Sequence, residues 1–249
     1  MSNKILLFRG SPRSNIEEVE NYNITLEKVC DVINIRYMQE IPAYANARRI
    51  FLQGKWDYFV IATDDIVVTP ENIIQLEEDL ISHDVIGGMM NVDQHEYMKE
   101  DGNLNICHEL ALKDRKLRSY NWIKRNGLPE DNIFQVKFNG FALLGIKRDI
   151  IKEIEFAGDG IFRGKNMKFG ASLDFVFCWD CHVRNIPVFV DKRIDMKHLR
   201  TSGTHQVGLR KPEIWLNNEL LNRCSHNNKI IKEYNNRPYA VCGECDSFC

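Results

Sequence analysis

The sequence predicts an α/β fold with a largely parallel central sheet. Short apolar strands alternate with segments of helical composition along most of the 249 residues. One strand, Tyr58–Ala62, is apolar throughout, which is typical of a sheet covered on both faces. The clearest helix start is Thr69-Pro70, because a threonine N-cap followed by proline at the first helical position commonly opens a helix. The inward positions expected on that helix are Ile73, Ile74, Leu76 and Leu80.

The elements expected from these patterns follow one another to about residue 198. The polar loop Arg9–Asn15 comes after the first strand. The stretch 93–132 is polar and of mixed charge, and we interpret it as an excursion that elaborates the binding face. In chain order we expect strand Lys4–Phe8, a helix from Ile16, strand Asp31–Tyr37, helix Ala43–Gln53, strand Tyr58–Ala62, the helix after Thr69, strands Asp84–Met90 and Val136–Ile146, helices Arg148–Glu155 and Leu173–Val183, strand Pro187–Asp191 and a turn to Ile194–His198.

Composition and charge exclude several classes of protein. A net charge of −2 argues against a protein that binds nucleic acid as its main partner, because counterion release needs a basic surface. The hydrophobic content of 44% excludes disorder as the default state. The first apolar run is too short for a signal peptide, and no run approaches the length of a membrane span. We therefore expect a soluble, cytoplasmic protein whose cysteines are free thiols or metal ligands.

Two adjacent acids, Asp64 and Asp65, follow the apolar strand directly. Ligands of open α/β sheets bind at the carboxyl ends of strands, where a divalent cation bridging to phosphates would balance two carboxylates. Neighbouring side chains of a strand diverge, so we expect one of the two acids to meet the metal. The alternative is that the pair merely begins a turn, where Asp is common.

Three further features could belong to the same site. Asp174 opens a helix and could serve as a general base, although a helix cap is its commoner role. His198 follows a strand, where a hydrogen-bonded or surface histidine is the ordinary case. Arg48 and Arg49 form a basic pair on the helix before the acidic strand, and a solvated helix face is the usual role of such a pair.

In this order, the features resemble the GT-A glycosyltransferases, most closely the family-2-like branch of the nucleotide-diphospho-sugar transferase superfamily. Tyr58–Pro70 is similar to the strand that carries the Asp-x-Asp metal motif, and Asn139–Arg148 to the stretch that lines the donor and acceptor sites. Leu173–Cys178 resembles the helix that supplies the base, and Val188–Asp191 with His198 the closing strand and late histidine. The resemblance implies a Rossmann-like three-layer sandwich over residues 1–210.

The resemblance also implies an activity and a role for each candidate residue. The chain would transfer a sugar from a nucleotide-diphosphate donor to a hydroxyl acceptor (a glycan, a lipid-linked molecule or a protein), with inversion and with Mn²⁺ or Mg²⁺. Two positions depart from the family: Thr63 replaces the first acid of the metal motif, and Leu173 replaces the Glu before Asp174. The implied roles are metal binding by Asp65 and His198, base catalysis by Asp174, donor binding by Arg9, Arg48, Arg49 and Asp64, and acceptor contacts by Asn139, Gly140 and Phe141.

Two other functions share these features. A nucleotidyltransferase of related fold would use the same metal carboxylate, and Arg9–Arg13 weakly resembles the basic, glycine-containing loop of that class. A catalytically silent binding protein could keep the fold alone. Release of pyrophosphate would favour the first of these alternatives, whereas release of a nucleoside diphosphate would favour sugar transfer.

The last residues, 211–249, are expected to form a cysteine-rich extension with a helix over Pro212–Asn222. The C-x-x-C spacing of Cys242 and Cys245 lets two thiolates reach one zinc ion. Free cysteines are the alternative, and for Cys178 and Cys181, on a helix, small buried thiols are the better interpretation. The ligands that could complete a structural zinc site are Cys224, His226 and Cys249.

Overall fold

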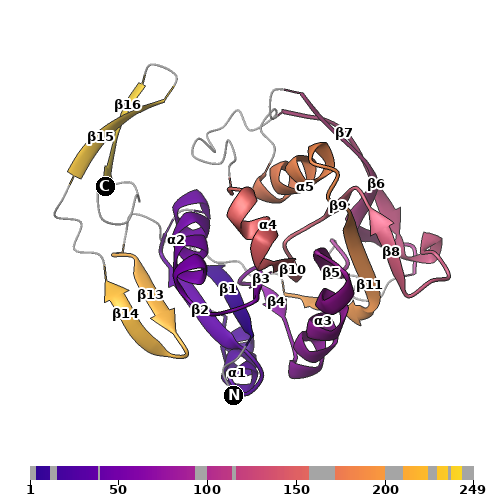
Figure 1. The fold of residues 1–249 in the computed structure, drawn as a ribbon, viewed down its shortest axis with the longest axis horizontal. Coiled ribbons are helices and arrows are strands. Elements are labelled where there is room, and N and C mark those ends of the chain that lie inside the picture. The colour runs from indigo at the N-terminus through magenta and orange to yellow at the C-terminus, as the bar shows by residue number, and fades with distance from the viewer. Residues whose placement is uncertain are drawn as a thin grey trace.

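A computed structural model describes residues 4–11, 16–38, 40–92, 100–113, 116–156, 172–199, 210–223, 229–234 and 237–242, with backbone alone for 116–117, 222–223, 229–234 and 237–242. The largest sheet of this part of the chain has nine strands in the order β14-β13-β2-β1-β3-β10-β5-β11-β8 (Figure 1). Its strands are β1 (Ile5–Ser11), β2 (Asp31–Arg36), β3 (Tyr58–Ile61), β5 (Val85–Met89), β8 (Ile133–Val136), β10 (Leu144–Lys147), β11 (Val188–Asp195), β13 (Glu213–Leu216) and β14 (Glu219–Arg223).

The core of this sheet is mainly parallel. Strand β1 runs parallel to β2 and to β3, and β11 runs parallel to β5. Strand β10 lies antiparallel between β3 and β5, so those two neighbours share one direction. The carboxyl ends of five strands therefore lie along one edge of the sheet, which we call the carboxyl edge: those of β1, β2, β3, β5 and β11. The α/β class predicted from the sequence is confirmed.

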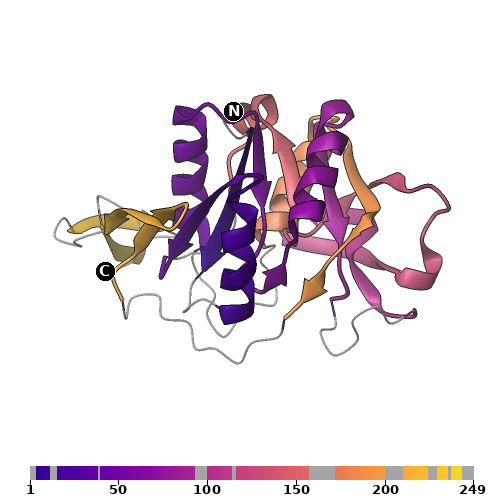
Figure 2. The ribbon, with the colours of Figure 1, turned by 90° about the horizontal axis from the view of Figure 1, so that it is seen from below.

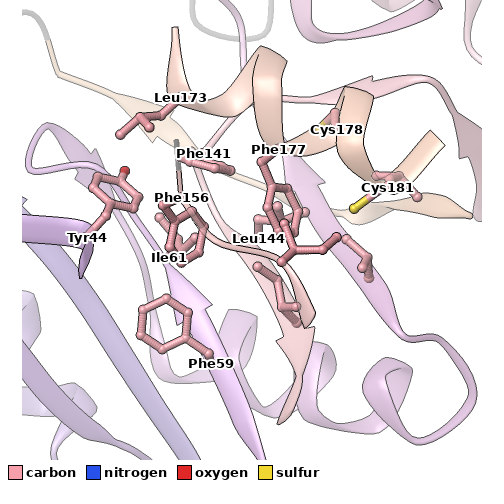
Figure 3. Packing of buried hydrophobic residues seen from close by; sticks show 14 of the residues in the cluster. Tyr44, Phe59, Ile61, Phe141, Leu144, Phe156, Leu173, Phe177, Cys178 and Cys181 are labelled. Atoms are coloured by element: carbon pink, nitrogen blue, oxygen red, sulfur yellow. The ribbon is translucent and has the colours of Figure 1, made fainter. Parts of the chain in front are cut away.

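Helices cover both faces of the sheet, as the continuous apolar strands predicted (Figure 1, Figure 2). One face carries a core rich in aromatic rings, here called the aromatic core, that α2 (Glu40–Gln53), α4 (Arg148–Glu153) and α5 (Leu173–Val183) help to build. The opposite face carries an aliphatic core with α1 (Glu17–Leu26) and α3 (Pro70–Ser82). In the aromatic core, rings from three segments distant in sequence meet: Phe141 and Phe177 lie 5.8 Å apart, and Phe156 and Phe177 lie 5.6 Å apart (Figure 3).

The expected start of α3 is confirmed in detail. Thr69 caps the helix and forms a reciprocal capping box with Asn72, and Pro70 is the first helical residue. Ile74 differs from the expectation, because its side chain is 49% exposed. The buried positions Ile73, Leu76 and Leu80 share one face, and Ile74 lies about 100° around the helix from Ile73.

The expected strand Val136–Ile146 is divided into three. Its first part ends β8, and its second part, β9 (Phe138–Asn139), pairs with β6 (Asn103–Lys113) outside the main sheet. A turn follows, in which the Ala142 amide donates to the Gly140 carbonyl at 2.7 Å, before the chain enters β10. The chain thus leaves the main sheet after Val136 and returns to it after the turn at Gly140. Within the polar stretch 93–132, strands β6 and β7 (Lys116–Lys124) pair antiparallel.

The helix expected over Pro212–Asn222 is wrong, because that segment forms the hairpin β13–β14. Asn217 and Asn218 have φ values of 45° and 61°, a left-handed conformation that Asn tolerates and that tight hairpins need. Strand β13 pairs with β2, and the Asn217 side chain accepts a 2.8 Å bond from the Val32 amide. Bonds to the edge of β2 therefore override the local helical pattern, and the backbone that follows forms a second hairpin, β15 (Lys229–Tyr234) with β16 (Arg237–Cys242).

In the described part of the chain, no helix has both the length and the apolar composition needed to cross a membrane.

Candidate functional site

The turn after β3 separates the two acidic side chains, as their adjacency predicted. Asp64 is 8% exposed and accepts a 3.2 Å hydrogen bond from the Ser11 hydroxyl at the end of β1. The Asp65 side chain is 19% exposed, and its Oδ2 lies 3.4 Å from Nε2 of His198. Asp64 therefore faces the sheet, and Asp65 faces a histidine.

A short ladder brings His198 to Asp65. Strand β12 (Lys197–His198) pairs antiparallel with β4 (Ile66–Val67), so that His198 lies opposite Ile66. The next residue, Leu199, donates its amide to the Asp65 carbonyl at 2.7 Å. The structure thus brings together the two residues that the family resemblance implies as metal ligands.

The pair offers one oxygen and one nitrogen ligand at a partly open position. Among the residues that the structure describes, no group of three or more His, Cys, Asp or Glu side chains could hold a metal ion. A cation at Asp65 and His198 would therefore take its other ligands from phosphate oxygens and water. Mg²⁺ and Mn²⁺ in phosphate chemistry are commonly bound in that way, by one or two protein ligands and the substrate.

Arg9 supports the acidic turn from within the protein. It is 1% exposed, and its Nη1 donates to the carbonyls of Thr63 at 2.8 Å and Ile66 at 3.0 Å. Burial lowers the pKa of Arg9 to about 10, an effect that the charge of Asp64 opposes, so the guanidinium stays protonated at neutral pH. Arg9 thus holds the acidic turn from beneath, and its role as a donor ligand stays a prediction.

The arginine pair on α2 serves other partners. Arg48 donates from Nε to the Ile151 carbonyl at 2.9 Å and from Nη2 to the Lys152 carbonyl at 3.1 Å. These carbonyls lie in the last turn of α4, where free acceptors are normal and arginine often caps them. Arg49 is exposed and donates to the Asn46 side chain at 3.2 Å. The bonds of Arg48 hold α2 to α4, and we do not propose it further as a phosphate ligand.

Asp174 lies half-buried in the first turn of α5. Its Oδ1 accepts hydrogen bonds from the Ser172 hydroxyl and, at 2.9 Å, from the Phe175 amide. The preceding Leu173 is 2% exposed and points into the aromatic core near Phe141 (Figure 3). A Glu at position 173 would be buried among apolar side chains, which explains why this chain lacks it.

The segment 139–141 connects the acidic turn to α5. The Phe141 carbonyl accepts from the Thr63 amide at 3.1 Å, and Cys178 of α5 lies 3.5 Å from the Asn139 carbonyl. Asn139 is fully buried, and Phe141 is 4% exposed within the aromatic core. Both side chains make internal contacts, and Gly140 bonds to the backbone of β6. The acceptor contacts expected of these three residues stay a prediction.

One polar residue of this region was missed by the sequence analysis. Asn105 of β6 donates to Asn139 Oδ1 at 3.1 Å and accepts from the Met90 amide at 2.7 Å. It thereby ties the excursion to the end of β5. Asn is common in polar loops, and nothing in its spacing indicated these partners.

A partly buried ion pair was missed as well. Arg125, just after β7, forms a two-pronged pair with Asp195 at 2.6 and 2.9 Å. It also donates to Asn91 Oδ1 at 2.8 and 3.0 Å. The side chains of Arg125 and Asp195 are 14% and 13% exposed. This clamp fixes the β6–β7 excursion at the carboxyl edge, next to the strand that leads to His198.

The cysteines of the main domain are confirmed as buried free thiols. Cys30, Cys107, Cys178 and Cys181 have no disulfide partner. Burial raises the pKa of Cys30 and Cys181 to about 12, so these thiols are inert. The zinc prediction is not tested: Cys224, His226, Cys245 and Cys249 lie outside the described residues, as does the side chain of Cys242.

Comparison with known proteins supports the fold. No family model and no curated protein matches the sequence. Among solved structures, A197 from STIV has a TM-score of 0.53 at 15% identity, over 90% of this chain and 99% of that one.

Two further structures are more distant. One is CMP:2-keto-3-deoxy-manno-octonic acid synthetase complexed with CTP, with a TM-score of 0.38 at 10% identity, over 77% of this chain and 90% of that one. The other is UDP-glucose pyrophosphorylase complexed with UDP-glucose, with a TM-score of 0.38 at 11% identity, over 79% and 91%. Their superposition is too loose to carry an argument. The chain has a Rossmann-like α/β fold similar to that of A197 from STIV.

Proposed function

We propose that this protein is a metal-dependent glycosyltransferase that uses a nucleotide-diphosphate sugar. The observation that carries the proposal is the pairing of Asp65 with His198 at 3.4 Å on the carboxyl edge of the sheet. Crevices at that edge are where α/β folds of this kind bind nucleotides. The resemblance of the motif order to the GT-A family supports the choice of sugar transfer.

Asp65 and His198 would hold the metal ion together with the diphosphate of the donor. An imidazole ligand favours Mn²⁺ over Mg²⁺, because Mg²⁺ prefers oxygen ligands. When bound, the ion would stabilise the negative charge that develops on the departing nucleoside diphosphate. Asp64, whose carboxylate is held by Ser11, would keep the turn in the shape that presents Asp65.

Asp174 would take the proton from the acceptor hydroxyl. The carboxylate is partly exposed and is fixed at a helix start by Ser172 and the Phe175 amide, so it meets the requirement that a general base be held in place. With Asp174 on the side of the sugar away from the leaving group, the product would be inverted. The acceptor would be a hydroxyl of a glycan, a lipid-linked molecule or a protein.

Metal-dependent binding tests the first half of the proposal. Purified protein would be titrated by calorimetry with a panel of nucleotide-diphosphate sugars, with Mn²⁺, with Mg²⁺ and with EDTA. We expect binding of at least one donor that requires the metal and is lost in Asp65→Asn and His198→Gln. The matched control is Asp149→Asn, because the Asp149 side chain is 86% exposed and pairs only locally, with Lys152. Metal-dependent binding that survives both site variants would refute the assignment.

The products test the second half. We expect slow release of nucleoside diphosphate from the bound donor with water as acceptor, and a loss of about 10²-fold or more in Asp174→Asn with donor affinity retained. Pyrophosphate released from a nucleoside triphosphate would instead identify the nucleotidyltransferase. Absence of donor binding across the whole panel would identify a silent binding protein.

A further inference from the structure

A small polar cavity lies beneath the acidic turn. It has a volume of about 10 Å³, and five of its lining side chains are polar, those of Arg9, Ser11, Asn23, Asn34 and Asp64. They come from β1, α1, β2 and the turn after β3. The cavity is therefore a meeting point of four segments, and its volume is the space that about one water molecule needs.

Three of these lining residues carry four buried polar atoms that have no hydrogen-bond partner among the described residues: Nε and Nη2 of Arg9, Oδ1 of Asn23 and Oδ1 of Asn34. The three residues are 1%, 6% and 8% exposed, so bulk water does not reach these atoms. Buried polar atoms in folded proteins almost always have a partner, from the protein or from an ordered water. Four such atoms on three residues that line the same cavity point to a common partner inside it.

We propose that this cavity binds one structural water molecule that accepts from Arg9 and donates to Asn23 and Asn34. Two of the four atoms are donors and two are acceptors, which matches the two lone pairs and two protons of water. An anion would satisfy the arginine and leave both amide oxygens unpaired. A cation would do the reverse, beside a buried positive charge.

The water completes the bonding of the Arg9 guanidinium. On one side, Nη1 holds the carbonyls of Thr63 and Ile66, which frame the acidic turn. On the other side, Nε and Nη2 would reach α1 and β2 through the water. The water thereby connects the Asp64–Asp65 turn to two elements that carry no residue of the candidate site. This role does not depend on the reaction that the protein catalyses.

A crystal structure of the wild-type protein, from crystals grown in sodium bromide, tests the proposal. We expect one peak in the cavity, within hydrogen-bond distance of all four atoms, without the anomalous signal of bromide. The orientation of the two Asn amides decides whether the cavity takes water or a halide. If both amides were turned with Nδ2 inward, four donors would face the cavity and a halide would bind. A bromide peak, or a cavity without density at a resolution that shows other internal waters, would overturn the proposal.

Substitutions give a second measurement. Asn34→Leu and Asn23→Leu each remove one acceptor, and we expect each to raise the unfolding equilibrium constant about two- to tenfold. Because both residues bind the same water, the unfolding equilibrium constant of the double variant should rise by less than the product of the two single increases. The control pair is Asn34→Leu with Asn46→Leu, because Asn46 lies on α2 and makes its own hydrogen bond to the Pro42 carbonyl. In this pair the two increases in the unfolding equilibrium constant should multiply. Equal behaviour of the two pairs would contradict a shared water, and failure of a variant to fold leaves the crystal experiment decisive.

Discussion

The imidazole of His198 lies 3.4 Å from the carboxylate of Asp65, although 133 positions separate the two residues. The contact depends on the two-residue ladder between β12 and β4 and on the bond from Leu199 to the Asp65 carbonyl. If Asp65 only began a turn after β3, the chain would not need to return to it through β12. The proposed metal site rests on this pairing.

The identity of the metal should follow the chemistry of position 198. In His198→Asp the nitrogen ligand becomes an oxygen ligand, so we expect the ratio of Mn²⁺ to Mg²⁺ affinity to fall. Calorimetric titration of both ions in the presence of the preferred donor measures this ratio. An unchanged ratio would show that His198 does not touch the metal.

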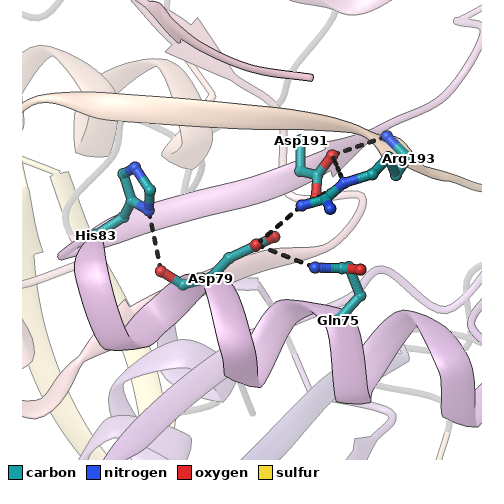
Figure 4. A network of polar contacts seen from close by, with 5 residues as sticks. All are labelled: Gln75, Asp79, His83, Asp191 and Arg193. Atoms are coloured by element: carbon teal, nitrogen blue, oxygen red, sulfur yellow. Dashed lines mark hydrogen bonds and ion pairs between the residues drawn. The ribbon is translucent and has the colours of Figure 1, made fainter. Parts of the chain in front are cut away.

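The carboxyl group of Asp79 predicts a dependence of stability on pH. Asp79 faces the fully buried Asp191, and Arg193 bridges the two at 3.3 and 2.7 Å (Figure 4). Burial and then the Asp191 carboxylate raise the pKa of Asp79 to about 6, against the opposing effects of Gln75 and Arg193. The folded protein therefore holds a proton that the unfolded chain releases near pH 4. The contribution is present below that pH and is lost as the pH rises through 6, so the free energy of unfolding should fall over this range.

Urea denaturation at pH 4.5, 6 and 8 checks this expectation. Asp79→Asn mimics the protonated carboxyl and should remove this part of the pH dependence, with its largest gain in stability over wild type at pH 8. Asp191→Asn is the contrasting variant, because Asp191 accepts the bonds of Arg193, and it should destabilise the protein at every pH. An Asp79→Asn profile parallel to that of wild type would contradict the assignment.

Arg148 should contribute strongly to stability. Its guanidinium donates to four carbonyls at and beyond the end of α2, those of Phe51, Leu52, Gly54 and Trp56, at distances between 2.7 and 3.3 Å. Hydrogen bonds from a charged donor are among the stronger ones and these four are partly buried, so Arg148→Met should cost about 2–4 kcal/mol in the free energy of unfolding. The matched control is Arg49→Met, which removes one exposed bond and should cost under about 0.5 kcal/mol. Similar losses in the two variants would show that the four bonds contribute little.

Gly87 should not tolerate even one added methyl group. A Cβ at this position would lie 2.3 Å from the Leu143 carbonyl oxygen and 2.7 Å from Nδ2 of Asn139. Because the first of these atoms belongs to the backbone, Gly87→Ala should cost about 1–3 kcal/mol, measured by thermal unfolding. Gly127→Ala is the control, since nothing lies within 4 Å of a Cβ there. Equal melting temperatures for the two variants would contradict the close approach of β5 to the 139–143 segment.

Much of the candidate site could be anticipated because its residues stand at element ends. Asp64 and Asp65 follow an apolar strand, and Asp174 begins a helix, so their places are set by local sequence. The partners of the arginines could not be anticipated in this way. Arg9 and Arg48 have the same side chain and both stand in regular elements, yet one is buried under the turn and the other caps α4.

The sequence by itself determined the α/β class, most strands and helices that build the main sheet and its two faces, and the start of α3, because periodicity and capping are local properties. The tertiary structure alone decided that residues 213–223 are strands, since the open edge of β2 supplies the hydrogen bonds. It also decided that Asp65 meets His198 and that Arg9 is buried. Each of these outcomes is a contact between segments distant in the chain, and such contacts depend on how the sheet is assembled, which no local pattern records.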